Sequence, residues 1–336
     1  MTENLLEVKN LSVNYVTEDR TVKAVNDVSF SLAKGESMGL VGETGAGKTT
    51  IALSVMQLVP YPPGIITGGE IYFKGTNLIE NSEKENEKIR GNGISMIFQD
   101  PMTALNPTMT IAKQMVEVVM KHTKCSRKEA EERCKKLMET VGIRRDRFND
   151  YPHQLSGGMK QRIIIAMALL CSPELLIADE PTTALDVTIQ AQVLELMNEL
   201  KEKLRTSLLL ITHDLGVVAQ VCDRVAIMYA GEIVESGTIA EVFDHPHHPY
   251  TIGLFGSIPS LDETAEKLKP IQGQMPDPTE LPEGCAFAPR CPYATGACRT
   301  RKPEMTGVGG TQMVRCLAHQ GVFESPELME EVRHGR

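Results

Sequence analysis

Residues 42–49 constrain this chain more than any other stretch, because their sequence, Gly-Glu-Thr-Gly-Ala-Gly-Lys-Thr, fits the phosphate-binding loop pattern. A short apolar strand is expected directly before the loop, over residues 37–41, and a helix directly after it, over residues 49–58. In such a loop the small residues let backbone N–H groups wrap the β-phosphate. Lys48 reaches the β- and γ-phosphates, and the Thr49 hydroxyl coordinates Mg²⁺. The pattern therefore predicts a strand–loop–helix unit that holds a nucleoside triphosphate.

A second stretch, residues 175–180, reads as a buried strand that ends in two carboxylates. Asp179 suits the coordination shell of Mg²⁺, usually through water. Glu180 is placed to polarise the water that attacks the γ-phosphorus. The pair is therefore the candidate hydrolytic centre beside the phosphate loop.

The remaining patterns predict an α/β fold with a helical insert. Residues 11–15 and 28–32 alternate apolar and polar positions, as antiparallel strands with one wet face do. Buried strands at 175–178 and 208–212 alternate with a helix over 190–204, which favours a parallel core sheet. A helical insert over about 100–160 interrupts that sheet, and Ser126 with Glu129 forms a capping box at the start of one of its helices.

Charge and hydropathy exclude several classes of protein. The 336 residues carry a net charge of −9, so there is no global basic field to attract nucleic acid. The first seven residues have acidic side chains, Glu3 and Glu7, where a secretory signal would have basic ones. The most apolar stretch, residues 163–171, is too short to cross a bilayer. The sequence predicts a soluble, cytosolic chain.

Residues 155–162, Leu-Ser-Gly-Gly-Met-Lys-Gln-Arg, resemble the signature of ATP-binding-cassette ATPases. In that family Ser156, Gly157 and Gly158 cover the γ-phosphate held by the phosphate loop of a partner. A Ser hydroxyl and glycine N–H groups at a helix N-terminus present a positive dipole to an anion. The resemblance covers roughly residues 5–255, and no motif of the family is missing.

Four smaller pieces are similar to the same family. Gln99 resembles the glutamine that touches Mg²⁺ and water, and His213 the switch histidine that senses the γ-phosphate. Residues 184–186, Ala-Leu-Asp, resemble the loop that crosses the dimer interface, and Tyr15 resembles the aromatic that stacks on adenine. The resemblance implies a P-loop NTPase of the ABC type that hydrolyses ATP. It implies catalytic roles for Glu180, His213 and Gln99, Mg²⁺ ligands at Thr49, Gln99 and Asp179, and ATP contacts from Tyr15, Gly42, Thr44, Gly45, Ala46, Gly47, Lys48, Thr49, Thr50 and Asp179.

Within this family, residues 98–107, 245–251 and 257–259 look like those of importers of dipeptides and oligopeptides. Related importers of nickel and glutathione share much of this pattern. The histidines of residues 245–251 could suggest a metal site, but the interleaved prolines favour a structural turn. Proline and glycine become frequent beyond residue 255, which divides the chain into an ABC ATPase domain over 1–255 and a C-terminal extension over 256–336.

The eight cysteines fall into two groups. Cys125, Cys134, Cys171 and Cys222 are widely spaced and are expected to pack as small hydrophobes. The other four crowd into the C-terminal extension: Cys285, Cys291, Cys298 and Cys316. They lack the C-x2–4-C pairs of zinc sites and the standard ferredoxin spacings. The resemblance to peptide importers implies that they hold a [4Fe–4S] cluster, with zinc or free thiols as the alternatives.

The resemblance also implies partners. Two ATPase subunits, often different but homologous chains, dock beneath two membrane-spanning permease subunits, and a solute-binding protein delivers the substrate. The chain is then peripheral, at the cytoplasmic face of the cell membrane. A cassette ATPase that acts on nucleic acid or ribosomes is the rival. Against it stand the acidic balance, a single cassette and an insert without sustained heptads.

Overall fold

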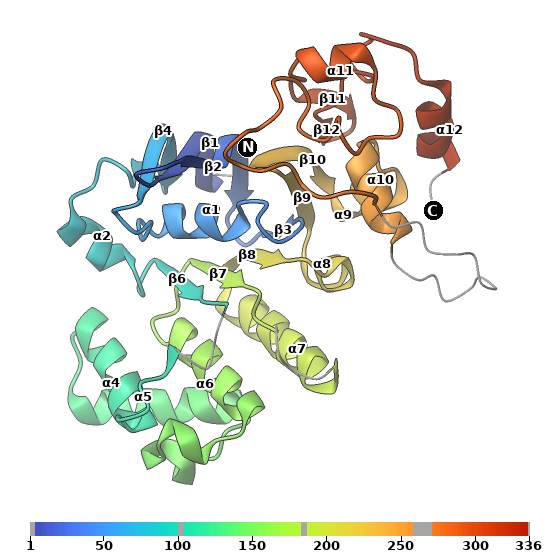
Figure 1. Cartoon of the computed structure of the whole chain (residues 1–336). Coiled ribbons are helices and arrows are strands. Elements are labelled where there is room, and N and C mark those ends of the chain that lie inside the picture. Colours follow the sequence, from blue (N-terminus) through green and yellow to red (C-terminus); the bar gives the residue numbers. More distant parts are fainter. Residues whose placement is uncertain (1–3, 100–103, 183–186, 258–270, 335–336) are drawn as a thin grey trace.

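The computed structural model describes residues 4–99, 104–182, 187–257 and 271–334. It has the predicted α/β architecture, with a four-stranded antiparallel sheet and an eight-stranded, mainly parallel core sheet. Figure 1 shows the helical insert and the C-terminal extension at opposite ends of this arrangement. The expected loop that crosses the dimer interface, residues 184–186, lies outside the described residues.

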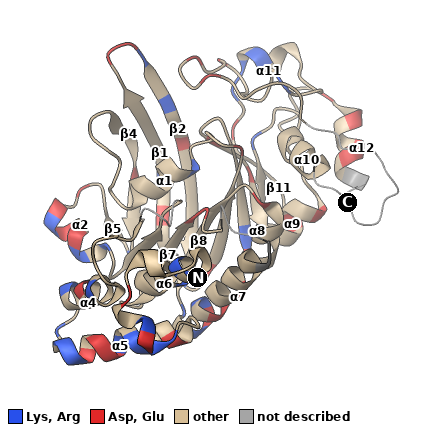
Figure 2. Ribbon diagram, turned by 60° about the horizontal axis from the view of Figure 1, so that its bottom comes forward, with Lys and Arg blue, Asp and Glu red and all other residues tan. Residues whose placement is uncertain are grey.

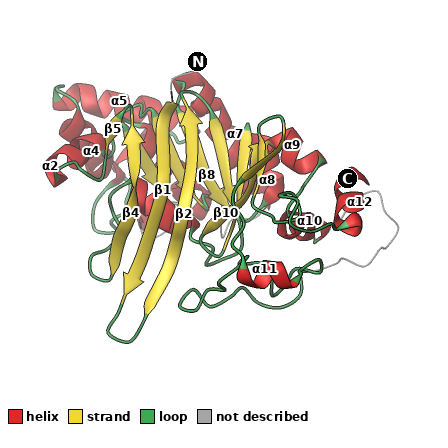
Figure 3. Cartoon of the chain, turned by 90° about the horizontal axis from the view of Figure 1, so that it is seen from above, coloured by secondary structure: helices red, strands yellow, loops and turns green. Residues whose placement is uncertain are grey.

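The antiparallel sheet is built from the first part of the chain (Figure 3). Its strand order is β2-β1-β4-β5, with β1 (Asn4–Val16), β2 (Thr21–Ala33), β4 (Gly64–Phe73) and β5 (Thr76–Asn77). Leu6, Val8, Leu11 and Val13 of β1 are buried, while its polar positions are more exposed. This alternation is the one-wet-face pattern that the sequence predicts.

The core sheet has the strand order β11-β12-β10-β9-β3-β8-β7-β6. Its parallel strands pair in the order β9-β3-β8-β7-β6, and the remaining three strands pair antiparallel. The strands are β3 (Ser37–Val41), β6 (Ile94–Ile97), β7 (Leu175–Asp179), β8 (Ser207–Thr212), β9 (Arg224–Tyr229), β10 (Glu232–Thr238), β11 (Thr306–Gly309) and β12 (Gln312–Val314). Both faces of the parallel strands are covered, as such sheets require.

Successive residues of the core strands pack into two different hydrophobic clusters. In β7, Leu175 and Ile177 join α1 (Lys48–Val55) and the antiparallel sheet in one cluster. Leu176 and Ala178 point into the other cluster, with the helices of the opposite face. Because strand side chains alternate, one apolar run can anchor a layer on each side. The phosphate-loop helix α1 thus lies between the two sheets.

The helical insert follows β6. It contains α4 (Ile111–His122), α5 (Arg127–Thr140), two 3₁₀ turns (Arg145–Asn149 and Pro152–Gln154) and α6 (Gly157–Leu169), whereas α2 (Glu83–Ile89) precedes β6. The predicted capping box at the start of α5 is confirmed, with Ser126 N–H donating to Glu129 at 2.7 Å. Figure 2 shows that both signs of charge are interspersed on α5. The insert therefore presents a mixed rather than a basic surface there.

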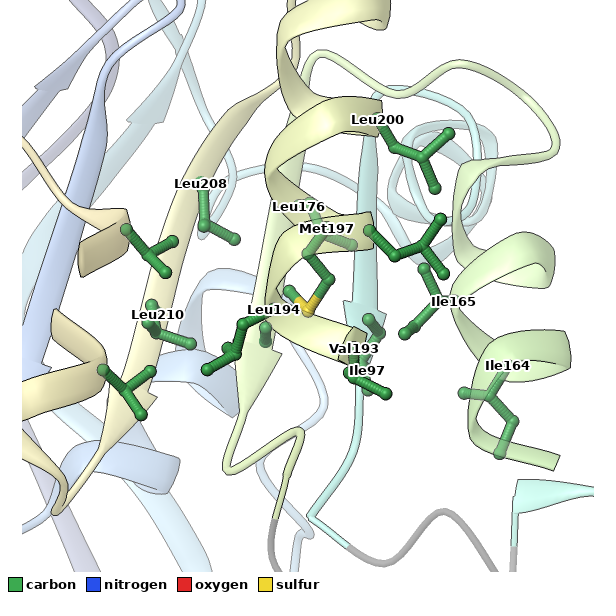
Figure 4. Packing of buried hydrophobic residues seen from close by; sticks show 14 of the residues in the cluster. Ile97, Ile164, Ile165, Leu176, Val193, Leu194, Met197, Leu200, Leu208 and Leu210 are labelled. Carbon is green, nitrogen blue, oxygen red and sulfur yellow. The ribbon is translucent and has the colours of Figure 1, made fainter. Parts of the chain in front are cut away.

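The helices that cover the far face of the core sheet include α7 (Val187–Leu204) and α8 (Leu215–Val221). Figure 4 shows Leu194 of α7 on the side of Leu210 of β8 and Val193 beside Ile97 of β6, and Met197 belongs to the same buried cluster. The spacing of these three α7 residues matches one face of a helix. This packing fixes the back of the sheet, whose opposite face carries α1.

The C-terminal extension continues the core sheet. After α9 (Ile239–Asp244) and α10 (Pro249–Gly256), the described chain resumes at residue 271 and includes α11 (Gly296–Thr300) and α12 (Pro326–His334). Its strand β12 pairs with β10, so that Val314 lies opposite Glu235. Backbone hydrogen bonds therefore join the extension to the ATPase fold.

Among the described residues, no helix is both long and apolar enough to span a membrane.

Candidate functional site

The phosphate loop turns sharply between β3 and α1, and two of its glycines have no room for a side chain. A Cβ on Gly42 would fall on the backbone oxygen of Met228, and one on Gly47 would fall on that of Ala24. Gly47 also has φ of 98°, in the left-handed region, where it begins α1. Glycine is therefore required at both positions by close backbone approach, and at Gly47 by conformation as well.

Lys48 is folded over the loop that precedes it. Its Nζ donates to the carbonyl oxygens of Gly42 at 2.7 Å and Glu43 at 3.0 Å, and the residue is only 6% exposed. Burial lowers the pKa of this ammonium, and the nearby carboxylates of Glu180 and Asp179 oppose that shift. The Lys48 ammonium therefore lies among acidic groups and over the first residues of the loop.

Asp179 ends β7 beside the loop, and it is 1% exposed. The Thr49 hydroxyl donates to its carboxylate, but Oδ1 has no hydrogen-bond partner among the described residues. Burial raises the pKa of this carboxyl, with the neighbouring Glu180 adding to the shift. A buried, unpartnered carboxylate oxygen next to a hydroxyl is a donor set that suits Mg²⁺. The residues present therefore fit the cation that the sequence predicts.

The three residues predicted to act in hydrolysis come together. Gln99 donates from Nε2 to Glu180 Oε2 at 3.2 Å, and His213 Nδ1 lies 3.3 Å from Glu180 Oε1. The backbone N–H of Glu180 donates to Ile211 at 2.8 Å, which anchors the residue to β8. Glu180 also has φ of 45°, and such strained residues cluster at active sites. Three strand ends thus converge on one carboxylate.

Tyr15 is also brought to the loop helix. Its hydroxyl lies 3.3 Å from the Thr50 hydroxyl on α1, although the two residues are 35 positions apart. Tyr15 is half-buried, at the end of β1. The hydroxyl end of Tyr15 therefore borders the start of α1.

The signature residues lie elsewhere. Ser156 caps α6, where its hydroxyl accepts from the Met159 N–H at 3.4 Å, and Gly157 and Gly158 open the helix. The helix α6 covers the face of the core sheet opposite to α1. In the described parts of the chain no hydrogen bond joins these three residues to the phosphate loop. They do not complete this chain's own site.

Sequence reasoning missed the residues that hold Glu43. Its backbone N–H donates to the Tyr250 hydroxyl at 3.1 Å, and its carboxylate accepts from Arg290 at 3.0 and 3.1 Å. Glu43 occupies a position of the loop that the pattern leaves open, and Arg290 is 247 positions away. No local signal connects them. Only the acidic side chain inside an anion-binding loop could have drawn attention, because it needs a cation nearby.

Comparison with family models first defines the class. Residues 25–183 match the model described as "ABC transporter", and residues 234–298 match "Oligopeptide/dipeptide transporter, C-terminal region". The solved dimeric post-hydrolysis state of the ATP-binding cassette MJ0796, bound to ADP and phosphate, has a TM-score of 0.63 and 26% identity. That match covers 70% of this chain and 98% of the other. The chain is thus an ABC ATPase in fold and in loop sequence.

Two curated relatives from Bacillus subtilis (strain 168) narrow the class. The oligopeptide transport ATP-binding protein OppD is 52% identical, over 97% of this chain and 93% of its own. The dipeptide transport ATP-binding protein DppD is also 52% identical, over 94% of each chain. This chain therefore belongs to the family of ATP-binding proteins of oligopeptide and dipeptide ABC transporters, and it is an ATPase.

The predicted iron–sulfur cluster is wrong. The structure, as far as it is described, holds no group of three or more His, Cys, Asp or Glu side chains that could bind a metal ion, which removes zinc as well. The relatives are named as ATP-binding proteins and not as iron–sulfur proteins. No cluster ligands are therefore assigned to Cys285, Cys291, Cys298 and Cys316, which are free cysteines.

Packing explains why that prediction fails. The four thiols line a cavity of about 20 Å³, room for about one water molecule. Burial raises the pKa of Cys285 and of Cys291 to about 12, so both thiols are protonated in this apolar surrounding. Cys298 and Cys316 pack in apolar clusters with Leu317 and Val314. Apolar side chains thus surround these two thiols in the extension.

The histidine stretch before α10 is a structural turn, as its prolines favour. His248 caps α10 by accepting from the Tyr250 N–H at 3.1 Å. The N–H groups of His247 and His248 donate to the buried Glu235 at 2.7 and 2.9 Å. These bonds fix the position of Tyr250 and, through it, one side of the phosphate loop.

Proposed function

We propose that this chain powers the import of di- and oligopeptides across the cytoplasmic membrane by hydrolysing ATP. The observation that carries the proposal is the convergence of Gln99 and His213 on the carboxylate of Glu180, beside a phosphate loop with a buried lysine. The family of peptide-transporter ATP-binding proteins supports the substrate class. These residues follow the neighbouring parallel strands β6, β7 and β8, which Figure 1 shows side by side in the core sheet.

ATP would bind with its phosphates in the loop. Lys48 would exchange its two carbonyl partners for β- and γ-phosphate oxygens, a favourable exchange because a buried ammonium binds an anion more strongly than a neutral carbonyl. Tyr15 would stack on the adenine, close to Thr50. The backbone of the loop would wrap the phosphates through the residues Gly42, Thr44, Gly45, Ala46, Gly47, Thr49 and Thr50.

Hydrolysis would proceed by in-line attack of water on the γ-phosphorus. Glu180 would accept a proton from this water as its oxygen bonds to phosphorus and the bond to the β–γ bridging oxygen breaks. Gln99 and His213, which hold the two oxygens of Glu180, would fix the direction of that carboxylate. Thr49, Gln99 and Asp179 would hold Mg²⁺, which when bound neutralises phosphate charge.

The signature residues Ser156, Gly157 and Gly158 would serve the ATP of a second, homologous ATPase subunit. They open a 13-residue helix on a face away from this chain's own loop, so their positive dipole is free for a partner's γ-phosphate. The dimeric state of the related cassette MJ0796 supports such pairing. The assembly would dock peripherally on two membrane-spanning permease subunits at the cytoplasmic face, with an extracytoplasmic solute-binding protein as indirect partner and no nucleic acid.

We also propose the division into an ABC ATPase domain over residues 1–255, with a helical subdomain over about 100–160, and an extension over 256–336. The change of character that supports it is the rise in proline and glycine beyond residue 255. Figure 1 shows α11 and α12 at the end of the molecule away from the helical insert.

The test is Glu180→Gln in the assembled transporter. ATP turnover should fall about 10²- to 10⁴-fold, the range for loss of a general base, while ATP binding survives. The amide keeps the shape of the carboxylate and its contacts to Gln99 and His213. Glu174→Gln, at a partly exposed site before the other end of β7 and paired with Lys74, is the matched control and should leave turnover unchanged. Wild-type turnover in Glu180→Gln would remove Glu180 as the base.

The substrate class needs its own assay. Vesicles that contain this chain with its permease subunits and binding protein should take up a labelled dipeptide only when ATP is enclosed with the ATPase. Uptake should stop in Glu180→Gln vesicles. Uptake of nickel or glutathione in place of the peptide would reject the peptide assignment and leave the ATPase assignment intact.

A further inference from the structure

The C-terminal part of the chain contacts the phosphate loop at Glu43, the second residue of the loop. Glu43 is bonded from two directions, its N–H to Tyr250 of α10 and its carboxylate to Arg290 of the extension. Both partners lie within residues 234–298, the segment that matches the C-terminal region of peptide transporters. The nucleotide loop is therefore braced by a segment that is not part of the cassette motifs.

Arg290 is built into this position. Its side chain is only 6% exposed, and its Nε donates to the Gln272 carbonyl at 3.0 Å. The guanidinium carbon lies 5.7 Å from the centre of the Tyr229 ring and 6.0 Å from that of Phe287. Aromatic faces attract a guanidinium and shield it from water, which strengthens its pairing with a carboxylate. Arg290 therefore has one orientation, and Glu43 is the acidic group at its end.

The aromatic rings around Arg290 form one packed unit. The rings of Tyr229 and Tyr250 are 4.7 Å apart, and Phe287 lies 5.2 Å from Tyr229 and 5.5 Å from Tyr250. Tyr229 ends β9, Tyr250 belongs to α10 and Phe287 to the extension. This unit of Tyr229, Tyr250 and Phe287 places Arg290 at a fixed distance from the core sheet.

The position of Glu43 matters to nucleotide because of Lys48. The Glu43 carbonyl is one of the two oxygens that hold the Lys48 ammonium, and it also accepts from the Ala46 N–H at 3.1 Å. A shift of Glu43 would therefore move the Lys48 ammonium and the backbone N–H of Ala46, both of which belong to the anion-binding loop. Met275, also in the extension, covers Gly45, where its Cε would lie 3.2 Å from an added Cβ.

We propose that Arg290 is a positioning residue for the phosphate loop, and that through Glu43 the C-terminal extension sets the affinity of the site for ATP. Arg290 acts through Glu43 and touches no reacting atom. The coupling is reciprocal: nucleotide in the loop must stabilise the docking of the extension by the same free energy with which the extension favours nucleotide.

The first experiment compares Arg290→Ala and Arg290→Lys with wild type in the assembled transporter. In Arg290→Ala the KM for ATP should rise about tenfold, the scale of one lost charge-assisted hydrogen bond, while kcat changes less than about twofold. Arg290→Lys keeps the charge but not the planar fork, so its KM should be intermediate. Arg299→Ala, an exposed arginine of the same extension, is the matched control and should equal wild type. An unchanged KM in Arg290→Ala would overturn the proposal.

Two further measurements separate positioning from a general loss of structure. Glu43→Gln should raise the KM to a similar degree, and the double variant with Arg290→Ala should be no worse than either single variant. ATP should protect the extension, residues 271–334, from proteolysis in wild type and not in Arg290→Ala. If Arg290→Ala does not fold, Arg290→Lys and Glu43→Gln carry the same comparison. Additive effects, or equal protection by ATP in wild type and variant, would refute the coupling.

Discussion

Gly47→Ala tests the claim that the loop has no room for a Cβ. The substitution places a side chain at φ of 98°, which costs about 1–2 kcal/mol for a residue other than glycine. The new Cβ also falls on the backbone oxygen of Ala24, in β2, so that strand or the loop must move. Overpacking of this kind costs about 1–3 kcal/mol. The two together amount to about 2–5 kcal/mol of strain.

Gly75→Ala is the matched control for this change. Gly75 has φ of 77° in the turn between β4 and β5, and an added Cβ there meets no atom within 4 Å. It therefore carries the conformational cost without the clash. If the loop absorbs the strain, Gly47→Ala should lose at least about 30-fold in ATP affinity, which corresponds to 2 kcal/mol. If β2 absorbs it, the melting temperature should fall by about 2–4 °C per kcal/mol.

The assay is a titration with a fluorescent ATP analogue, together with thermal unfolding of the same samples. For each variant, the loss in ATP-binding free energy is added to the loss in free energy of unfolding. This sum should be larger for Gly47→Ala than for Gly75→Ala by the cost of the clash with Ala24, about 1–3 kcal/mol. A Gly47→Ala variant that matches Gly75→Ala in both ATP affinity and melting temperature would refute the reasoning that the Ala24 carbonyl excludes a side chain.

Two predictions concern charge. Lys48→Ala should weaken binding of the ATP analogue about 10- to 150-fold, because one hydrogen bond to a charged group contributes about 1.5–3 kcal/mol. Lys74→Ala, at an exposed lysine paired with Glu174, is the control and should not weaken it. Equal affinity in the two variants would contradict the role of Lys48. His248 is fully buried beside α10, and burial lowers its pKa to about 3. The unfolded chain therefore binds more protons below about pH 6.5, so the free energy of unfolding should fall by about 1.4 kcal/mol per pH unit from there toward pH 3. His248→Asn, which keeps a capping oxygen but does not titrate, should flatten this slope in acid-unfolding titrations; an unchanged slope would assign the acid sensitivity to other groups.

Short sequence motifs and local periodicity were enough to predict most of the fold and the catalytic residues of the site. The loop of residues 42–49 follows one short buried strand, and Asp179 and Glu180 lie at the end of another. Both motifs can be recognised from their local sequence alone. Helix ends were less predictable. The helix after the loop was expected to reach residue 58, but α1 ends at Val55. Gln57 has φ of 51°, and its carbonyl accepts a hydrogen bond at 2.7 Å from Arg90, a contact that the local pattern does not indicate.

Long-range pairings could not be predicted. Nothing near Glu43 indicates Arg290, because the contact depends on how the aromatic unit of Tyr229, Tyr250 and Phe287 packs. The prediction that the four cysteines hold a cluster failed for a related reason. Their spacing reveals how many thiols are near one another in sequence, but not that apolar neighbours such as Leu317 surround Cys298 and leave no ligand geometry.

The pairing of β12 with β10 has a consequence for how such chains can be recombined. Ser236 and Glu235 of β10 lie opposite Met313 and Val314, so the last strand of the cassette is an inner strand only while β12 is present. A chain shortened after residue 255 would turn β10 into an open edge, ready to pair with another molecule. A hybrid of two related transporters must therefore take β10 and β12 from matching parents. When parts of such proteins are exchanged, the extension and the cassette therefore have to be moved together.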